Sequence, residues 1–198
     1  MTRVIAGAAG GRRLAVPPGT LTRPTSDRAR EALFSTLESL LGTLSGRRLL
    51  DLYAGSGAVG LEALSRGASH VLLVENDRQA HAALVANVAA VGLAGATPSA
   101  QPVERLVAGP NPAEPFDVAF LDPPYAHPAE SVRSVLSALL GNGWLRAGGI
   151  AVVERATRER GWNWPEGLSE DRSRHYGDAT LWYGRAAGPG SGTDPTSG

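Results

Sequence analysis

The sequence predicts an α/β fold around a mostly parallel β-sheet, closed at one edge by an antiparallel hairpin. From Arg47 onward, short apolar runs alternate with helical stretches, which is the pattern of consecutive βα units. A glycine-rich turn joins the first of these runs to the helix that follows it. Near the end of the chain, the segments 172–176 and 179–183 flank Gly177-Asp178, a turn sequence typical of hairpins.

Size and composition fit a single domain with a small extension. The chain has 198 residues, enough to bury a substantial core, and shows no repeat of fixed period. It contains no cysteine, which excludes disulfides and thiolate metal sites, and its four histidines show no metal-ligand spacing. No apolar run reaches about 18 residues and no signal-peptide pattern opens the chain, so we expect a cytoplasmic protein outside the membrane. We also expect it to be monomeric and free of metal.

The first 25 residues are expected to form a small extension. The segments 3–6 and 12–16 are strand-like and are joined by a glycine-rich turn, which predicts a β-hairpin. A loop begins at Pro17. A helix is expected from about Ser26 to Leu44, because apolar residues recur there at intervals of three to four positions.

The main domain is expected to span residues 26–185. Its predicted strands are 48–53, 70–75, 98–101, 116–121 and 149–154, followed by the hairpin, and its predicted helices are 58–66, 77–91 and 129–140. The segment 186–198 has too little apolar character to fold and is expected to be disordered.

The stretch LLDLYAGSGAVGLEAL carries Gly55, Gly57 and Gly60 in GxGxxG spacing, between a predicted strand and a predicted helix. Glycines let the backbone approach a ligand, and the start of the helix adds free N–H donors. A tight turn without a ligand is the simpler interpretation. Glu75 favours a ligand, because it ends the next strand, where a carboxylate can accept hydrogen bonds from both hydroxyls of an adenosine ribose.

Two cofactors suit this pattern, a nicotinamide dinucleotide and S-adenosylmethionine. Asp51 precedes the glycines by only four residues. A carboxylate there would repel the pyrophosphate of a dinucleotide, whereas it would attract the ammonium and sulfonium groups of S-adenosylmethionine. The sequence therefore favours S-adenosylmethionine.

A rigid segment, Asp122-Pro-Pro-Tyr125, follows the apolar run 116–121. The two prolines fix the backbone and remove two N–H donors, which leaves the Asp122 carboxylate and the Pro123 carbonyl as acceptors beside the Tyr125 ring. Such acceptors fit an amine attached to an aromatic base. We expect the amine to lose its proton to Asp122 during or after methyl transfer, while Tyr125 stacks on the base. A proline-rich strand exit with a surface tyrosine is the alternative interpretation.

Positive charge is concentrated at the start of the chain. All 19 basic residues are arginines, and residues 1–30 hold six of them against one acid, Asp27. The six are Arg3, Arg12, Arg13, Arg23, Arg28 and Arg30. They predict a surface for phosphates and bases of an unpaired or flipped-out nucleotide. A solvated helix face, with Arg28 paired to Asp27 or Glu31, is the alternative.

Four stretches together resemble the bacterial RsmD-type 16S rRNA guanine-N2 methyltransferases over roughly residues 1–185. They are RVIAGAAGGRRLAVP, RPTSDRAREALFSTL, LDLYAGSGAVGLEALSRGASHVLLVEND and FDVAFLDPPY, in this order. The resemblance implies a Rossmann-like class I methyltransferase fold with a seven-stranded sheet. It also implies methylation of the N2 of one guanine, numbered 966 by convention, in 16S rRNA of a free or assembling small ribosomal subunit.

The resemblance also implies roles for residues. The implied catalytic residues are Asp122, Pro123, Pro124 and Tyr125, and the implied cofactor contacts are Asp51, Tyr53, Ala54, Gly55, Ser56, Gly57, Glu75, Asn76, Gln101 and Asp122. At the adenine contact, Gln101-Pro102 stands where family members often carry an acid or amide followed by alanine. A methyltransferase of DNA amino groups, a nicotinamide-dependent dehydrogenase and a non-catalytic RNA-binding domain remain as alternatives.

Overall fold

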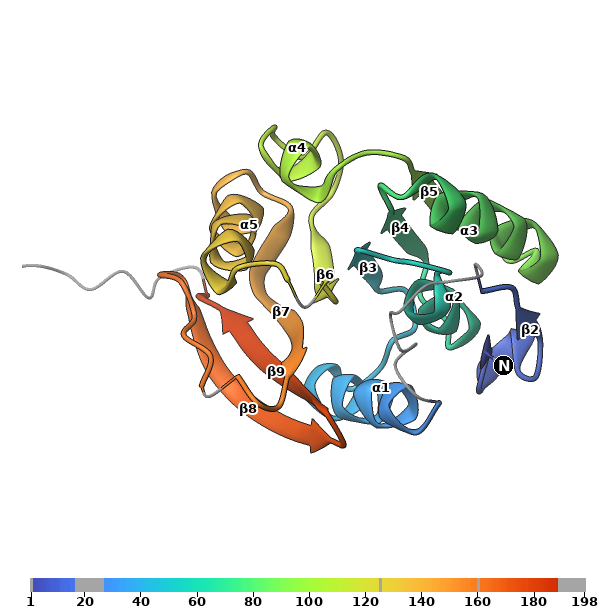
Figure 1. The fold of residues 1–198 in the computed structure, drawn as a ribbon, viewed down its shortest axis with the longest axis horizontal. Coiled ribbons are helices and arrows are strands. Elements are labelled where there is room, and N and C mark those ends of the chain that lie inside the picture. Colours follow the sequence, from blue (N-terminus) through green and yellow to red (C-terminus); the bar gives the residue numbers. More distant parts are fainter. Residues whose placement is uncertain (1, 17–26, 125, 160, 189–198) are drawn as a thin grey trace, which may run out of the picture.

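The computed structural model describes residues 2–16, 27–124, 126–159 and 161–188, which fold around one seven-stranded sheet (Figure 1). The strand order is β5-β4-β3-β6-β7-β9-β8. The strands from β5 to β7 are parallel, whereas β9 is antiparallel to both of its neighbours. The predicted fold class is confirmed. The strands are β3 (Arg48–Leu52), β4 (His70–Val74), β5 (Ala96–Ser99), β6 (Phe116–Leu121), β7 (Leu145–Ala156), β8 (Leu168–Tyr176) and β9 (Ala179–Ala186).

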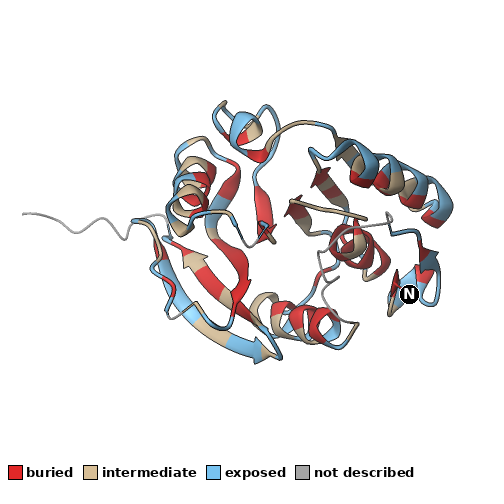
Figure 2. Cartoon of the chain, viewed as in Figure 1, coloured by how far each residue is buried: buried red, intermediate tan, exposed pale blue. Residues whose placement is uncertain are grey.

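Helices cover both faces of the sheet, and on each face buried apolar side chains of the helices and strands pack into one cluster (Figure 2). One cluster joins α1, α2 and α3 to side chains such as Leu49 and Phe120. The other joins α4 and α5 to Leu50 and Leu121, which alternate with the first pair along the same strands. The helices are α1 (Asp27–Leu41), α2 (Ala58–Ser65), α3 (Arg78–Val91), α4 (Val103–Val107) and α5 (Ala129–Gly141).

Two predicted element boundaries were wrong, and one helix was missed. Helix α1 ends at Leu41 rather than Leu44, because Gly42 adopts a φ of 77°, a left-handed conformation that ends helices. Strand β5 covers Ala96–Ser99 rather than 98–101, with Pro98 inside the strand. Helix α4 was not predicted, because its 5 residues are too few to show a helical period.

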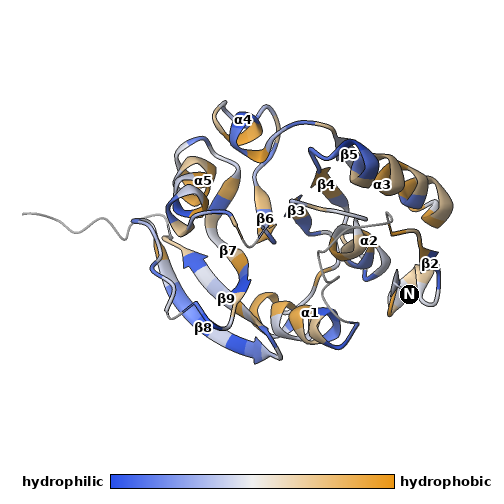
Figure 3. Ribbon diagram, in the orientation of Figure 1, coloured by the Kyte–Doolittle hydropathy of each residue, from blue (hydrophilic) through white to orange (hydrophobic). Residues whose placement is uncertain are grey.

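The C-terminal strands are longer than predicted. Strand β7 begins at Leu145 and passes through Gly148-Gly149, where its pairing with β6 shifts register. Strand β8 carries mostly hydrophilic residues, as expected for a strand at the edge of a sheet (Figure 3). Ala186 lies in β9 and is buried, so the predicted start of the tail at residue 186 is corrected. No helix in the described ranges has both the length and the apolar character needed to cross a membrane.

The predicted N-terminal hairpin is present, although its regular strands are short. Strand β1 (Thr2–Arg3) pairs antiparallel with β2 (Arg13–Leu14), and a 3₁₀ turn, η1 (Gly7–Ala9), lies between them. Val4 extends the pairing through its bonds to Arg12 and Gly11. Val4, Ala9 and Leu14 belong to the apolar cluster that contains α1 and α2, so the hairpin packs directly on the main body.

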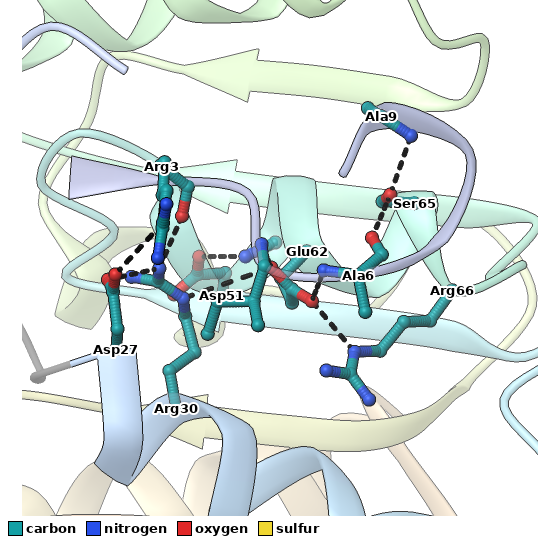
Figure 4. A network of polar contacts seen from close by, with 11 residues as sticks. Arg3, Ala6, Ala9, Asp27, Arg30, Asp51, Glu62, Ser65 and Arg66 are labelled. Carbon is teal, nitrogen blue, oxygen red and sulfur yellow. Dashed lines mark hydrogen bonds and ion pairs between the residues drawn. The ribbon is translucent and has the colours of Figure 1, made fainter. Parts of the chain in front are cut away.

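A buried glutamate on α2 holds the hairpin in place (Figure 4). The Glu62 carboxylate accepts hydrogen bonds from the backbone N–H of Ile5 at 2.6 Å and of Ala6 at 3.0 Å, and from Arg66 Nε at 2.8 Å. Ser65 receives a hydrogen bond from the N–H of Ala9 at 2.9 Å. These bonds satisfy a carboxylate that has no exposed surface, and they fix the hairpin to the helix that follows the glycine-rich turn.

Candidate functional site

Strand register brings the three predicted acids to the same end of the sheet, the end at which the parallel strands have their carboxyl termini. Asp51, on β3, is paired with Leu73 of β4 and Phe120 of β6. Glu75 directly follows β4, and Asp122 directly follows β6. Because the carboxyl ends of parallel strands lie at the same end of the sheet, these three acids lie near one another at the end where ligands of such sheets bind.

Asp51 is almost completely buried and receives one hydrogen bond, from the N–H of Gly60 at 2.8 Å. Burial raises the pKa of Asp51 to about 7, and the charge of Glu75 adds to this effect, while the bond from Gly60 opposes it. A cationic group beside Asp51 would offset the cost of ionising it. The ammonium of a methionine moiety is such a group.

The glycine-rich turn has the backbone that its sequence predicts. Tyr53, Gly55 and Gly57 have φ values of 63°, 55° and 80°, so three alternate residues adopt left-handed conformations. A Cβ added at Gly57 would lie 2.4 Å from Leu84 Cδ1, whereas one added at Gly55 would meet no described atom within 4 Å. Gly57 is therefore needed for packing, and Gly55 leaves open space in front of the turn.

Glu75 links the turn to the start of α3. Its two carboxylate oxygens accept hydrogen bonds from the N–H of Gly55 at 2.8 Å and of Asp77 at 2.7 Å. Each oxygen keeps one acceptor position, so the carboxylate can still receive two ribose hydroxyls. This arrangement, together with the open space at Gly55, fits the adenosine part of S-adenosylmethionine.

A pocket of about 410 Å³ lies beside this carboxylate. Of the predicted cofactor residues, Tyr53, Glu75 and Asn76 line it. The lining does not include Asp51, Ala54, Gly55, Ser56, Gly57, Asp122 or Gln101, and Gln101 donates its amide to Ser99 Oγ at 2.9 Å. Its neighbours Pro102 and Val103 line the pocket instead. The complete lining is Tyr53, Val74, Glu75, Asn76, Asp77, Arg78, Pro102, Val103, Glu104, Pro124 and His127.

The segment after β6 lies beside the same pocket. Asp122 is partly exposed, Pro123 is buried and Pro124 contributes to the pocket wall. Desolvation, followed by the negative charges of Glu154 and Asp51, raises the pKa of Asp122 well above its usual value. A carboxylate of raised pKa is a stronger proton acceptor once it is ionised. Tyr125, the last predicted catalytic residue, lies outside the described residues.

Sequence reasoning missed three residues of this region. Glu154, buried on β7, lies beside Asp122, and Glu104 and His127 line the pocket. The position of Glu154 at the carboxyl end of a predicted strand could have identified it. Glu104 and His127 could not be identified in this way, because α4 was not predicted and His127 was set aside as one of four scattered histidines. In the described parts of the chain, no group of three or more acids and histidines could hold a metal ion.

The predicted basic surface is only partly formed. Arg3, Arg13 and Arg28 are exposed, and Arg3 pairs with Asp27 at 3.4 Å. Arg12 caps the end of α3 by donating to the carbonyls of Ala90 and Val91. Arg23 lies outside the described residues.

The prediction that Arg30 belongs to this basic surface was wrong. It has no exposed surface and forms ion pairs with Asp27 at 3.0 Å and Glu62 at 3.9 Å, so in this structure it presents nothing to RNA (Figure 4). Desolvation lowers the pKa of Arg30, while the charges of Asp27 and Glu62 oppose the shift. The amphipathic position of Arg30, one turn from Phe34 and Leu33, was the available sequence signal for burial.

Comparison with known proteins identifies the family. The family model described as Conserved hypothetical protein 95 matches residues 2–185, nearly the whole chain. The chain belongs to this family. Ribosomal RNA small subunit methyltransferase D of Escherichia coli K12 is 36% identical over 152 residues, which are 77% of this chain and 73% of that protein. The putative rRNA methyltransferase YlbH of Bacillus subtilis is 36% identical over 157 residues, or 77% and 81% of the two chains. The family predicted from the sequence motifs is confirmed.

Solved structures agree with this membership. The putative methyltransferase yhhF of Escherichia coli superposes with a TM-score of 0.82 at 30% identity, covering 95% of this chain and 99% of that chain. Magnesium protoporphyrin IX methyltransferase of Synechocystis, solved with bound S-adenosylmethionine, is only 14% identical but has a TM-score of 0.61 over 80% of this chain and 79% of that chain. The second likeness concerns the fold alone, and the fold is that of class I S-adenosylmethionine-dependent methyltransferases.

Proposed function

We propose that this protein transfers the methyl group of S-adenosylmethionine to the exocyclic N2 of one guanine in 16S rRNA, guanine 966 in the conventional numbering. Family membership supports an rRNA methyltransferase that uses this cofactor. The choice of a guanine amine is supported by one observation. Asp51, Glu75 and Asp122 lie at the carboxyl ends of three neighbouring strands, beside a pocket to whose wall Glu75 and Pro124 contribute.

The cofactor assignment follows from the chemistry of the crevice. S-adenosylmethionine supplies a methyl group on a positively charged sulfur. Glu75 would hold the ribose hydroxyls, and Asp51 would hold the ammonium group. Pro102, Val103 and Asn76 would enclose the adenine. Tyr53, Ala54, Gly55, Ser56 and Gly57 would line the side of the cofactor that faces the turn. Tyr53 contributes to the pocket wall, whereas Gln101 and the other four residues are predictions without a pocket contact.

The segment after β6 would prepare the amine. The Asp122 carboxylate and the Pro123 carbonyl would accept the two hydrogens of the guanine N2, which favours a pyramidal nitrogen with an available lone pair. S-adenosylmethionine would supply the methyl carbon to the nitrogen lone pair, and the carbon–sulfur electron pair would stay on the sulfur of the neutral thioether product. The nitrogen then carries a positive charge and gives one proton to Asp122. Tyr125 would stack on the base and orient it.

The partner would be an unpaired stretch of 16S rRNA, free or in an assembling small subunit, in the cytoplasm. We propose that residues 1–25 are an extension that binds it and that the methyltransferase domain follows from residue 26. The candidate contacts are Arg3, Arg12, Arg13 and Arg23 of the extension and Arg28 of the domain. Exposed Arg3, Arg13 and Arg28 support this surface. We propose that the protein works as a monomer.

The test is transfer of labelled methyl groups to small subunits and to free 16S rRNA from cells that lack this modification, followed by mapping of the labelled nucleotide. Label on N2 of guanine 966 is the expected result. Label on a DNA amine or at another rRNA position would overturn the substrate assignment. Binding of rRNA without transfer would favour the non-catalytic alternative, and preferential binding of a nicotinamide cofactor in equilibrium dialysis would favour the dehydrogenase.

A further inference from the structure

His127 is held at both its backbone and its side chain, just after the Asp122–Pro124 segment. Its N–H donates to the carbonyl of Pro124 at 2.8 Å, and its own carbonyl accepts from Arg155 Nη2 at 3.0 Å. Arg155 is buried on β7 and is itself fixed by Glu159, 2.8 Å from its Nε. The backbone at His127 is therefore tied to the central sheet.

The His127 ring points to the opposite wall of the pocket. Its Nε2 lies 3.1 Å from Glu104 Oε1, and the Tyr53 hydroxyl donates to the same oxygen at 3.0 Å. The rings of Tyr53 and His127 meet edge to face, with centroids 5.6 Å apart. Three elements are joined in this way: the end of β3, the first turn of α4 and the loop that carries Asp122.

The charge state of Glu104 suits this contact. Partial burial alone would raise its pKa, but hydrogen bonds from its own backbone N–H, from His127 and from Tyr53 outweigh burial and lower the pKa of Glu104. Glu104 is therefore ionised at neutral pH and accepts from both partners. Of the other charged residues described, Glu75, Asp77 and Arg78 line this pocket and Asp122 lies beside it, while Arg155, paired with Glu159, donates to the His127 carbonyl.

We propose that His127 is a positioning residue for methyl transfer: through Glu104 it fixes the Asp122–Pro124 segment relative to the wall of the cofactor pocket. This inference rests on the proposed function, because it concerns the alignment of the amine with the methyl carbon. His127 itself need not touch either reactant. Its contact joins the segment that would hold the amine to the pocket that would hold the cofactor.

The geometry predicts an effect on rate rather than on stability. The side chains of His127 and Glu104 are 33% and 49% exposed, and polar contacts between exposed side chains contribute at most about 1 kcal/mol to folding. The rate of methyl transfer depends more strongly on geometry than the folding free energy does, because a misplacement of about 1 Å can lower a rate about 100-fold. Loss of this contact should therefore reduce kcat while leaving the fold intact.

The test compares His127→Ala, His127→Gln and Glu104→Gln with the wild type, in steady-state methyl transfer at saturating cofactor and rRNA. We expect His127→Ala to lower kcat by about 10- to 100-fold. Its affinity for S-adenosylhomocysteine and its Tm should stay close to those of the wild type. Glutamine can place an amide N–H near the position of Nε2, so His127→Gln should recover much of the rate. The double variant His127→Ala, Glu104→Gln should be no slower than the worse single variant, since both changes break one contact.

His175→Ala is the matched control, because His175 also makes one side-chain hydrogen bond, to Thr180 at 2.8 Å, but lies on β8. It should transfer methyl groups at the wild-type rate. An unchanged kcat in His127→Ala would overturn the proposal, and so would equal losses in His127→Ala and His127→Gln accompanied by a lower Tm. A wild-type protein that transfers no methyl group to rRNA would instead overturn the proposed function, and the inference with it.

Discussion

Asp122, directly after β6, lies beside Glu154 of the adjacent parallel strand β7, because each is one residue beyond the paired residues Leu121 and Val153. Alternation along the strands places both on the face that carries Phe120 and Val152, which is also the face of Asp51. Three acids therefore approach one another at the end of the sheet. The arrangement explains why the pKa of Asp122 is raised, with desolvation as the largest cause and the charges of Glu154 and Asp51 next.

Replacing Asp122 with asparagine should remove the proton acceptor while keeping the shape of the side chain. We expect methyl transfer to fall at least about 100-fold, the usual range for loss of a general base. Binding of S-adenosylhomocysteine, measured by calorimetry, should change little, because this ligand has no methyl group to transfer. Asp171→Asn, in an exposed acid of β8, is the control. Near-normal turnover of Asp122→Asn would reject the role of Asp122.

Glu154→Gln should change the pH dependence of the rate. A base with a raised pKa loses activity as the pH falls through that pKa, because protonation removes its acceptor function. Removing the negative charge of Glu154 lowers the pKa of Asp122, so the acid limb of the kcat profile should move to lower pH. The measurement is kcat between pH 5 and pH 9 for both proteins. An acid limb that stays in place would show that Glu154 does not act on the titrating group.

Cofactor binding should release a proton near neutral pH, because Asp51 has a pKa of about 7 in the ligand-free protein. The ammonium of the cofactor favours the ionised carboxylate, so affinity should increase as the pH rises toward 7 and level off above it, with a slope of at most about tenfold per pH unit. In the ligand-free protein, the same raised pKa makes folding less favourable as the pH rises from about 4 to about 7, because the folded state retains a proton that the unfolded chain has released.

Calorimetry with S-adenosylhomocysteine in buffers of different ionisation enthalpy measures this proton release directly. Asp51→Asn is the matched control, since the amide keeps the shape of the side chain but cannot titrate. The variant should bind more weakly at pH 8 and show no proton release. Equal release by the variant and the wild type would assign the titration to another group.

The sequence was sufficient for the parts of the site that depend on strand ends. Asp51, Glu75 and Asp122 could be placed together because parallel strands end at one edge, and apolar runs mark those strands. The contacts of Glu104 and Arg30 could not be predicted. Glu104 depends on a helix of 5 residues, and Arg30 pairs with Glu62, which is far away in sequence, as well as with Asp27 on its own helix. Contacts between residues far apart in sequence form only in the folded chain, so the charges of neighbouring residues do not predict them.

The arginines of the N-terminal region should divide into two classes. Charge reversal at the exposed residues, Arg13→Glu and Arg28→Glu, should weaken rRNA binding and reduce its salt dependence. With fewer phosphate contacts, fewer counterions are released when the rRNA binds. Filter binding at several salt concentrations measures both quantities. Unchanged affinity would leave these arginines as a solvated face.

Arg30→Met should act on stability instead. Breaking a buried ion pair costs about 3–5 kcal/mol, because one charge stays buried without its partner. In Arg30→Met the charge left behind is that of Glu62, which keeps Arg66 and two backbone N–H groups as donors, so we expect the lower end of that range. Urea unfolding gives the free energy. A stable Arg30→Met protein with weakened rRNA binding would contradict the burial of this side chain.

The glycines of the turn provide the sharpest test of where the cofactor lies. Gly57→Ala should lose about 2–4 kcal/mol of folding free energy, because its left-handed backbone disfavours a side chain and its Cβ would lie 2.4 Å from Leu84 Cδ1. Gly55→Ala carries only the backbone cost, about 1–2 kcal/mol, since its Cβ would meet no described atom within 4 Å.

That open space is where the proposed cofactor approaches the chain. Gly55→Ala should therefore fold but bind S-adenosylhomocysteine at least about tenfold more weakly, the equivalent of about 1.4 kcal/mol. Calorimetry below the unfolding transition separates this loss of affinity from any loss of stability. Unchanged affinity in folded Gly55→Ala would mean that the space in front of the turn does not hold the cofactor, and the assignment of Asp51 to its ammonium group would then lose its geometric basis.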